Sequence, residues 1–320
     1  MATRFENFLK RLHAHELLLG DGAWTTQMQK LGLQLGDCPE EWNLSHPDEI
    51  GNIAREYFLA GCDFCLANTF GGNKFRLVRH GFAAQVHALN VAGARLSHAV
   101  AEEFGGMVAA SVGPTGEFLQ PEGMLTRQEM HAAFAQQMGA LKEGGADCVL
   151  IETMYVLDEA LLAVQVAAEV GLPCMVSMTF ENTPAGFQTM PGVPLREAIA
   201  ALDQTSAEVI GTNCGNGVQE MVKLAAQIKA LTRKPVLVKP NASLREDAAH
   251  NVTYLETPEL IAASVPALAA AGISVLGGCC GTTPAHIRAF RREIDLLKQK
   301  TEAPAKHTKH TKHTKRTTEN

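Results

Sequence analysis

The sequence predicts a single-domain α/β protein with a (β/α)8 TIM-barrel fold, and three observations favour this fold class. Eight short apolar segments are spread along the 320-residue chain. They show little alternation of apolar and polar residues, which is typical of strands buried on both faces. Helical patterns separate these segments, and eight strands alternating with helices indicate a closed barrel. The alternative is an open doubly wound sheet, although the chain has neither the G-x-G-x-x-G nor the G-K-[ST] motif of a nucleotide-binding sheet.

The eight expected strands are apolar runs that end in polar or small residues. They cover residues 16–23, 63–70, 107–114, 147–154, 173–180, 209–214, 235–241 and 273–280.

Several helices between these strands carry end signals. Thr126-x-x-Glu129 predicts a capping box, and the helix that follows is expected to end at Gly144. The Thr-Pro pairs at 257–258 and 283–284 predict N-caps followed by proline at the first helical position. A further helix is expected over residues 48–60, where the next residue is glycine.

The composition predicts an acidic globular body with a basic tail. The formal net charge is −6, yet residues 303–320 hold five Lys or Arg against one Glu. An acidic body argues against nucleic-acid binding, and no apolar run reaches the ~18–20 residues of a membrane span. The eight cysteines lack small-scaffold spacing, and no signal-peptide pattern begins the chain. We therefore expect a cytoplasmic protein with no nucleic-acid or membrane partner, a barrel over residues 1–302 and a disordered Lys/His/Thr-rich tail over residues 303–320.

Polar residues directly follow the apolar runs, at the strand ends where barrel enzymes gather their chemistry. These ends carry Asp21-Gly22, Asn68-Thr69, residues 113–116, Glu152-Thr153, Thr179, Asn213-Cys214, Asn241 and Cys279-Cys280. A single acid after a strand is more often a helix cap than a catalyst. Eight such ends together predict one shared pocket.

Three cysteines stand at the ends of the sixth and eighth expected strands, which flank the seventh. Cys214 and the adjacent pair Cys279-Cys280 are therefore expected to converge over the barrel mouth. Three thiolates suit tetrahedral Zn²⁺, and three protein ligands leave the fourth position that marks a catalytic site. Alternatively, Cys279 and Cys280 pack in the core or form a vicinal disulfide. The glycines beside the pair, and Cys214 at the end of another strand, favour a metal site instead. Cys62-x-x-Cys65 is similar to a redox or zinc pair, but it opens a strand and has no partner pair at ligand spacing, so it is interpreted as packing. The other cysteines lie on loops, within strands or at a strand start: Cys38, Cys148 and Cys174.

A zinc ion held by three thiolates is electron-rich and is a poor Lewis acid for water. Its useful property is to bind a further thiol and to lower the pKa of that thiol. The bound thiolate stays nucleophilic, so these residues predict attack by a substrate thiolate on carbon, which is an alkyl transfer.

The motifs around these residues resemble the homocysteine S-methyltransferase family, the zinc barrels that methylate homocysteine to methionine. The matching stretches include LLLGDGA, NTFGGNK, IGTNCG, VKPNAS and GGCCGTTPAHI, and the full set covers residues 17–290. Within the family, the motifs are most similar to the homocysteine-binding domain of cobalamin-dependent methionine synthase. Trp24 departs from the pattern, because the family usually has a smaller residue there.

The resemblance implies a role for each matching residue. Cys214, Cys279 and Cys280 would be the zinc ligands and the catalytic groups. The implied substrate-binding residues are Asp21, Gly22, Asn68, Thr69, Glu152 and Asn241. Among these, Asp21 and Glu152 would bind the substrate ammonium, and Asn241 would lie near the zinc and fill its fourth position when substrate is absent.

Three functions are compatible with these motifs, and we expect the first. It is zinc-dependent methyl transfer to homocysteine, with the methyl group supplied by a separate corrinoid (cobalamin) protein or by a small sulfonium or ammonium compound. The second is a corrinoid-system methyltransferase that acts on another thiol or another methylated substrate. The third is a structural zinc barrel that only binds a partner, and the open fourth position and the acids Asp21 and Glu152 argue against it. No motif identifies the methyl donor.

Overall fold

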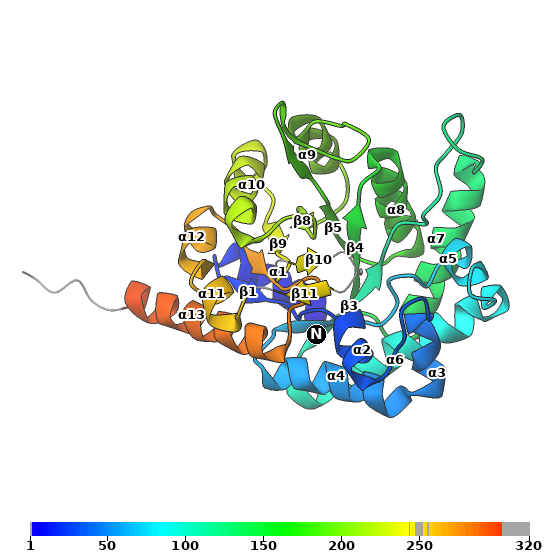
Figure 1. The fold of residues 1–320 in the computed structure, drawn as a ribbon, viewed down its shortest axis with the longest axis horizontal. Helices are drawn as coiled ribbons and strands as arrows, with labels where there is room; N and C mark the ends of the chain where they lie inside the picture. Colours follow the sequence, from blue (N-terminus) through cyan, green and yellow to red (C-terminus); the bar gives the residue numbers. More distant parts are fainter. Residues whose placement is uncertain (1, 243, 247–251, 255, 303–320) are drawn as a thin grey trace, which may run out of the picture.

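The computed structural model describes residues 2–242, 244–246, 252–254 and 256–302, and these form a (β/α)8 barrel. Eight parallel strands lie in the order β1-β12-β9-β8-β5-β4-β3-β2, and helices ring them (Figure 1). The strands are β1 Leu18–Leu19, β2 Phe64–Ala67, β3 Met107–Val112, β4 Cys148–Met154, β5 Cys174–Met178, β8 Val209–Asn213, β9 Val236–Lys239 and β12 Val275–Leu276. Each lies inside its expected range, so the fold class and all eight strands are confirmed.

The helices and two short hairpins complete the described elements. The helices are α1 Arg4–His13, α2 Thr25–Leu31, α3 Trp42–Ser45, α4 Pro47–Leu59, α5 Lys74–Val78, α6 Val86–Phe104, α7 Arg127–Glu143, α8 Leu157–Val170, α9 Leu195–Asp203, α10 Val218–Leu231, α11 Pro258–Ala262, α12 Val265–Ala270 and α13 Pro284–Glu302, with single 3₁₀ turns η1 Pro39–Glu41 and η2 Ala83–Gln85. The hairpins pair β6 Glu181–Thr183 with β7 Gly186–Gln188, and β10 Leu244–Glu246 with β11 Val252–Tyr254.

The barrel closes between β1 and β2 through the residue that precedes β2. The Asp63 N–H donates to the Leu19 carbonyl (2.6 Å), and the Asp63 carboxylate accepts from the Leu19 N–H (2.8 Å). Arg291 of α13 pairs with the same carboxylate at 2.6 Å. Helix α1 was not predicted, and it packs Phe8 edge-on against Phe64 with ring centroids 5.6 Å apart. Because Phe64 begins β2, α1 covers the end of the barrel opposite the polar strand ends.

The predicted helix ends are confirmed by their caps. The Thr126 hydroxyl accepts from the Glu129 N–H (3.2 Å), and the Glu129 carboxylate accepts from the Thr126 N–H (3.0 Å), so a capping box starts α7. Helix α4 begins at Pro47, one residue before the expected start, because proline suits the first helical position. The side chain of Thr257 caps α11, and α13 begins at Pro284 as expected.

The core is continuous through the barrel and its helical shell. Every residue of β2, β3, β5, β8 and β9 is buried, as expected for strands covered on both faces. The cysteines outside the cavity are all buried free thiols: Cys38, Cys62, Cys65, Cys148 and Cys174. The interpretation of Cys62 and Cys65 as packing residues is therefore confirmed.

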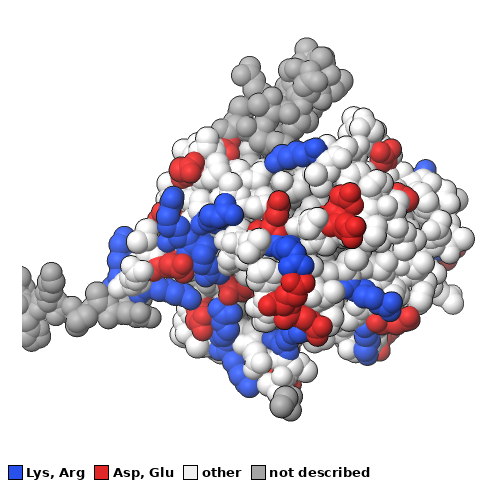
Figure 2. Space-filling model, turned by 90° about the horizontal axis from the view of Figure 1, so that it is seen from below, with Lys and Arg blue, Asp and Glu red and all other residues white. Residues whose placement is uncertain are grey.

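The surface of the helical shell is mixed in charge. Figure 2 shows Lys and Arg side chains interspersed with Asp and Glu over one face of the molecule. In the part of the chain that the structure describes, no helix combines the length and the apolar character needed to cross a membrane. The tail expected to be disordered, residues 303–320, lies outside the described residues.

Candidate metal and substrate site

A cavity of about 350 Å³ opens at the carboxyl ends of the barrel strands. Seven of the eight strands contribute residues to its wall, either directly or through the loop that follows; among the described residues, β5 contributes none. The polar and charged residues in the wall are Thr25, Thr26, Glu40, Asn68, Thr69, Arg76, His80, Ser111, Glu152, Thr153, Cys214, Lys239, Cys279 and Cys280. The predicted shared pocket therefore exists, but not with all eight strand ends.

Two expected strand ends face elsewhere because they bond to other parts of the fold. Thr179, after β5, donates its hydroxyl to the Asn213 carbonyl at 3.0 Å. Thr115, after β3, donates both its N–H and its hydroxyl to Glu159 of α8, each at 2.7 Å. For residues 113–116 and for Thr179 the expectation of a pocket position is wrong.

Cys214, Cys279 and Cys280 converge at one side of the cavity. β8 and β12 flank β9, so the two strand ends that carry these cysteines lie on either side of one strand, as predicted. The three Sγ atoms all lie within 4.8 Å of one another. A tetrahedral zinc with Zn–S bonds of about 2.3 Å holds its sulfurs about 3.8 Å apart, so the cluster needs little adjustment to accept one.

The backbone brings these cysteines together through unusual local geometry. Cys214 has φ +59°, a left-handed conformation that is uncommon outside glycine. Its N–H donates to the Lys239 carbonyl (3.2 Å), and the Cys279 N–H donates to the Pro240 carbonyl (2.9 Å), so strand-like pairing continues into both loops. A side chain at Gly278 would place its Cβ 2.2 Å from the Thr282 hydroxyl. The glycine before the cysteine pair is therefore required by close packing.

The three thiols share negative charge. Hydrogen bonds from Cys279 and Cys280 lower the pKa of Cys214 far below the usual thiol value, although burial opposes this shift. The same contact with Cys214 raises the pKa values of Cys279 and Cys280. The two neighbouring thiols thus favour ionisation of Cys214, and a bound cation would favour ionisation of all three.

Two asparagine amides face the sulfur cluster. The Asn241 Nδ2 donates to Cys214 Sγ (3.6 Å), and the Asn213 Nδ2 donates to Cys279 Sγ (3.7 Å). The Oδ1 of Asn241 is buried and has no hydrogen-bond donor among the described residues. A buried oxygen without a partner beside three thiols fits a metal ion. A cation would give the oxygen a partner and would also bind the sulfurs.

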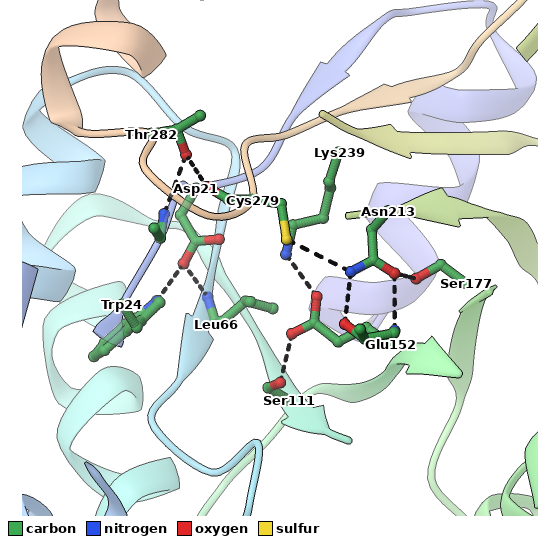
Figure 3. A network of polar contacts seen from close by, with 12 residues as sticks. Asp21, Trp24, Leu66, Ser111, Glu152, Ser177, Asn213, Lys239, Cys279 and Thr282 are labelled. Carbon is green, nitrogen blue, oxygen red and sulfur yellow. Dashed lines mark hydrogen bonds and ion pairs between the residues drawn. The ribbon is translucent and has the colours of Figure 1, made fainter. Parts of the chain in front are cut away.

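A buried ion pair lies beside the cysteines. The Lys239 ammonium at the end of β9 is 2.8 Å from Glu152 Oε2, and the other carboxylate oxygen accepts the Ser111 hydroxyl at 2.5 Å (Figure 3). The side chains of Lys239 and Glu152 are only 3% and 7% exposed. Burial would lower the pKa of Lys239, but the Glu152 and Asp21 carboxylates more than offset it and raise that pKa.

Asp21 lies beneath the cavity rather than in its wall. It is fully buried, and its Oδ2 accepts the Trp24 indole N–H and the Leu66 N–H, both at 2.7 Å (Figure 3). Its Oδ1 is buried and has no donor among the described residues. Burial raises the pKa of Asp21 to about 6, although the charge of Lys239 opposes the shift. The unusual Trp24 thus serves to hold the carboxylate in place.

Two further expected contacts, Asn68 and Thr69, line the cavity after β2. Asn68 donates to the Pro39 carbonyl (2.7 Å) and to the Asn43 side chain (2.9 Å), and the Thr69 hydroxyl donates to the Ser111 carbonyl (2.8 Å). Both side chains are buried and mainly support the wall. Gly22 also lines the cavity.

The sequence matches known proteins over most of its length. The model of the family described as homocysteine S-methyltransferase matches residues 18–294. The chain belongs to the homocysteine S-methyltransferase family. The methionine synthase of Mycobacterium leprae (strain TN) is 33% identical over 303 residues, which are 89% of this chain and 25% of that protein. Betaine–homocysteine S-methyltransferase 1 of Danio rerio is 29% identical over 323 residues, which are 93% of this chain and 78% of that protein. The chain therefore spans about a quarter of the length of the methionine synthase it matches.

Solved structures show the same fold. The metallated form of the homocysteine methyltransferase MmuM from Escherichia coli superimposes with a TM-score of 0.73 at 23% identity, covering 87% of this chain and 96% of that one. At 23% identity this likeness supports the barrel fold alone. The chemistry of the site is argued from the residues that line it.

Three site residues were missed by the sequence reasoning: Ser111, Asn213 and Lys239. Asn213 was noted only as a strand end, yet its Oδ1 accepts from the Ser177 hydroxyl (2.6 Å) and the Thr153 N–H (2.8 Å). For Lys239 a signal was available, because the run VLVKP places a lysine inside an otherwise apolar strand. Such a lysine is buried and needs a partner.

Proposed function

We propose that this protein is a zinc-dependent methyltransferase that transfers a methyl group to the sulfur of homocysteine and forms methionine. The observation that carries the proposal is the cluster of three Sγ atoms within 4.8 Å of one another at the wall of the barrel cavity. Membership of the homocysteine S-methyltransferase family supports the same reaction. A cavity of about 350 Å³ suits a small substrate.

In this proposal Cys214, Cys279 and Cys280 hold the zinc ion. When bound, zinc supplies acidity to the substrate thiol, so that the thiol binds as a nucleophilic thiolate at neutral pH. The Asn241 and Asn213 amides donate to the cysteine sulfurs and stabilise their charge. The free Oδ1 of Asn241 is the group that we propose fills the remaining position in the absence of substrate.

The amino-acid end of homocysteine is proposed to lie against the charged floor of the cavity. Glu152 and Asp21 carry the negative charge that an ammonium group requires, and Asp21 Oδ1 has an acceptor position free. Charge-assisted hydrogen bonds in a buried site are the strong ones, so the floor contributes orientation as well as affinity.

The methyl donor is proposed to be either a methylated corrinoid protein or a small sulfonium or ammonium compound. The names of two relatives support both classes: one is a methionine synthase, and the other a betaine–homocysteine methyltransferase. We propose that the donor reaches the cysteines through the opening of the cavity at the carboxyl ends of the strands, where Cys280 is exposed.

The test is methionine formation by the zinc-loaded protein from homocysteine and each donor in turn: methylcobalamin, S-methylmethionine and betaine. We expect methionine, measured by mass spectrometry, with at least one donor, and about one zinc per chain. Cys280→Ala should lose both metal and activity, while Cys62→Ala, at a buried cysteine outside the cavity, should keep both. An active, fully metallated Cys280→Ala protein, or no methionine with any donor, would overturn the proposal.

A further inference from the structure

Lys239 is a buried cation in the wall of the cavity. It is the last residue of β9, and its carbonyl accepts the Cys214 N–H at 3.2 Å, so its backbone is tied to the sulfur cluster. Its methylene chain lies against Gly277, where an added Cβ would stand 3.0 Å from Lys239 Cγ. The ammonium group is therefore held in one place by its surroundings.

This ammonium group has more hydrogen-bond donors than the fold uses. An ammonium carries three N–H donors, and Glu152 is the one acceptor that bonds it among the described residues. Lys239 and Ser111 each occupy one oxygen of Glu152, and each oxygen keeps a further acceptor site. A buried cation with donors left over in a cavity wall favours binding of an anion.

The position of Lys239 relative to the cysteines defines which anion it can reach. Figure 3 shows the side chains of Lys239, Glu152 and Cys279 together, and the ammonium is close enough to interact electrostatically with Cys279 and Asp21. If the substrate sulfur binds at the cysteines, a carboxylate a few bonds away falls within reach of this ammonium. The floor then offers two negative groups and one positive group, which complements an amino acid with both of its charges.

We propose that Lys239 binds the substrate carboxylate and so selects amino-acid thiols over simple thiols; this inference rests on the proposed function for its sulfur site. Lys239 is a specificity residue in this assignment, and not only the partner of Glu152. The other permanent cation in the wall is Arg76, which bonds the Pro114 carbonyl (3.0 Å) and lies over Phe70. It is only partly buried, and solvent screening weakens an anion site there.

The first test uses the wild-type zinc-loaded protein and three thiols that differ in one group. 4-Mercaptobutyrate has the carboxylate, 3-mercaptopropylamine has the ammonium, and 1-butanethiol has neither. We expect calorimetric titration to show 4-mercaptobutyrate binding ~10–100-fold more tightly than 1-butanethiol, since a charge-assisted hydrogen bond is gained. Equal affinities would overturn the inference without any variant.

The second test uses Lys239→Met, with Lys229→Met as the control. Lys229 bonds a backbone carbonyl outside the cavity, so its loss should leave all ligands unaffected. Lys239→Met should abolish the advantage of 4-mercaptobutyrate. It should leave 3-mercaptopropylamine unchanged or tighter, because Glu152 then has an oxygen free for the ammonium. Zinc content and circular dichroism check that the variant is folded. If it is not folded, the titration of the three thiols into the wild-type protein tests the inference alone.

Two outcomes of this series would overturn the inference. In the first, Lys239→Met weakens the binding of all three thiols equally, which would mean that Lys239 only supports Glu152. In the second, Arg76→Met weakens the binding of 4-mercaptobutyrate and Lys239→Met does not. The inference and the proposed function fail separately. A Lys239-dependent preference for 4-mercaptobutyrate supports the carboxylate site even if homocysteine is not methylated. Methylation of homocysteine without that preference supports the reaction and overturns the carboxylate site.

Discussion

At the scale of single residues, the site combines charges that a folded protein normally avoids burying. Asp21 is completely buried with one oxygen unpaired, and Glu152 and Lys239 form an ion pair with both side chains less than a tenth exposed. Buried charges are costly unless they are fully paired. The incomplete pairing of Asp21 and of the Lys239 donors therefore marks the places where a charged ligand would complete the network.

Asp21→Asn should stabilise the ligand-free protein at pH 7.5. The pKa of Asp21 is raised from 3.8 to about 6, so keeping it ionised in the fold costs up to about 3 kcal/mol at this pH. A raised carboxyl pKa means that stability is present at low pH and is lost as the pH rises through about 6. The gain from the substitution should therefore shrink to about half at pH 5.

Urea unfolding of both proteins between pH 5 and pH 8 measures this difference. Asp158→Asn, at an exposed position in the first turn of α8, is the matched control and should show no comparable gain. If Asp21→Asn is less stable than the wild type at pH 7.5, then Lys239 already compensates the Asp21 charge. If Asp21 binds the substrate ammonium as proposed, the same variant should bind homocysteine more weakly, because an amide replaces the carboxylate.

At the scale of elements, the loop between β12 and α13 determines where the cysteine pair lies. Its Thr282 hydroxyl donates to the Cys279 carbonyl (2.7 Å) and accepts from the Ala23 N–H (3.2 Å), which ties the loop to the end of β1. Gly281 has φ +80°, and Gly278 packs against Thr282 too closely for any side chain. The conformation of the loop that carries the cysteine pair thus depends on its glycines.

Gly278→Ala should weaken zinc binding and destabilise the protein by about 1–3 kcal/mol, because the new methyl group meets the Thr282 side chain and displaces the cysteine loop. Gly139→Ala is the control, since an added Cβ there meets nothing within 4 Å. In the interior of α7 this change should stabilise by about 0.5–1 kcal/mol. Zinc titration together with urea unfolding measures both effects. Wild-type zinc affinity in Gly278→Ala would show that the loop tolerates the methyl group.

At the scale of the whole molecule, the candidate metal site joins two strands that are not neighbours. Cys214 follows β8 and the cysteine pair follows β12, with β9 between them. The barrel itself is held by a continuous apolar core that does not include these cysteines. Zinc is therefore expected to stabilise a structure that already exists, rather than to create it.

Removal of zinc with a chelator should leave the far-ultraviolet circular dichroism unchanged and lower the urea midpoint. Restoring zinc to a free concentration one hundred times its dissociation constant should raise the free energy of unfolding by about 2.7 kcal/mol, because the ion binds only the folded site. Cys279→Ala should show no such response to zinc. A loss of helical signal on chelation would contradict the independence of the core from the metal.

Much of this organisation follows from local sequence. The eight strands, the capping box at Thr126 and the convergence of Cys214 with Cys279 and Cys280 were all predicted, because apolar runs, cap residues and strand order act over short ranges or through a regular fold. Cys62 and Cys65 were also interpreted correctly as packing residues, since they open an apolar strand. Helix α1 was missed although the sequence carries two signals for it: Thr3-x-x-Glu6 is a capping box, and Phe5, Phe8 and Leu12 recur at helical spacing.

Pairing across the barrel could be decided only by the tertiary structure. Lys239 and Glu152 are 87 residues apart, and only barrel closure brings the ammonium within 2.8 Å of the carboxylate. Thr179 and residues 113–116 follow strands as the site residues do, yet bonds to Asn213 and Glu159 direct them away from the cavity. The physical reason is that a strand end has two directions in which to place its side chains, and the choice depends on partners that lie far away in the sequence.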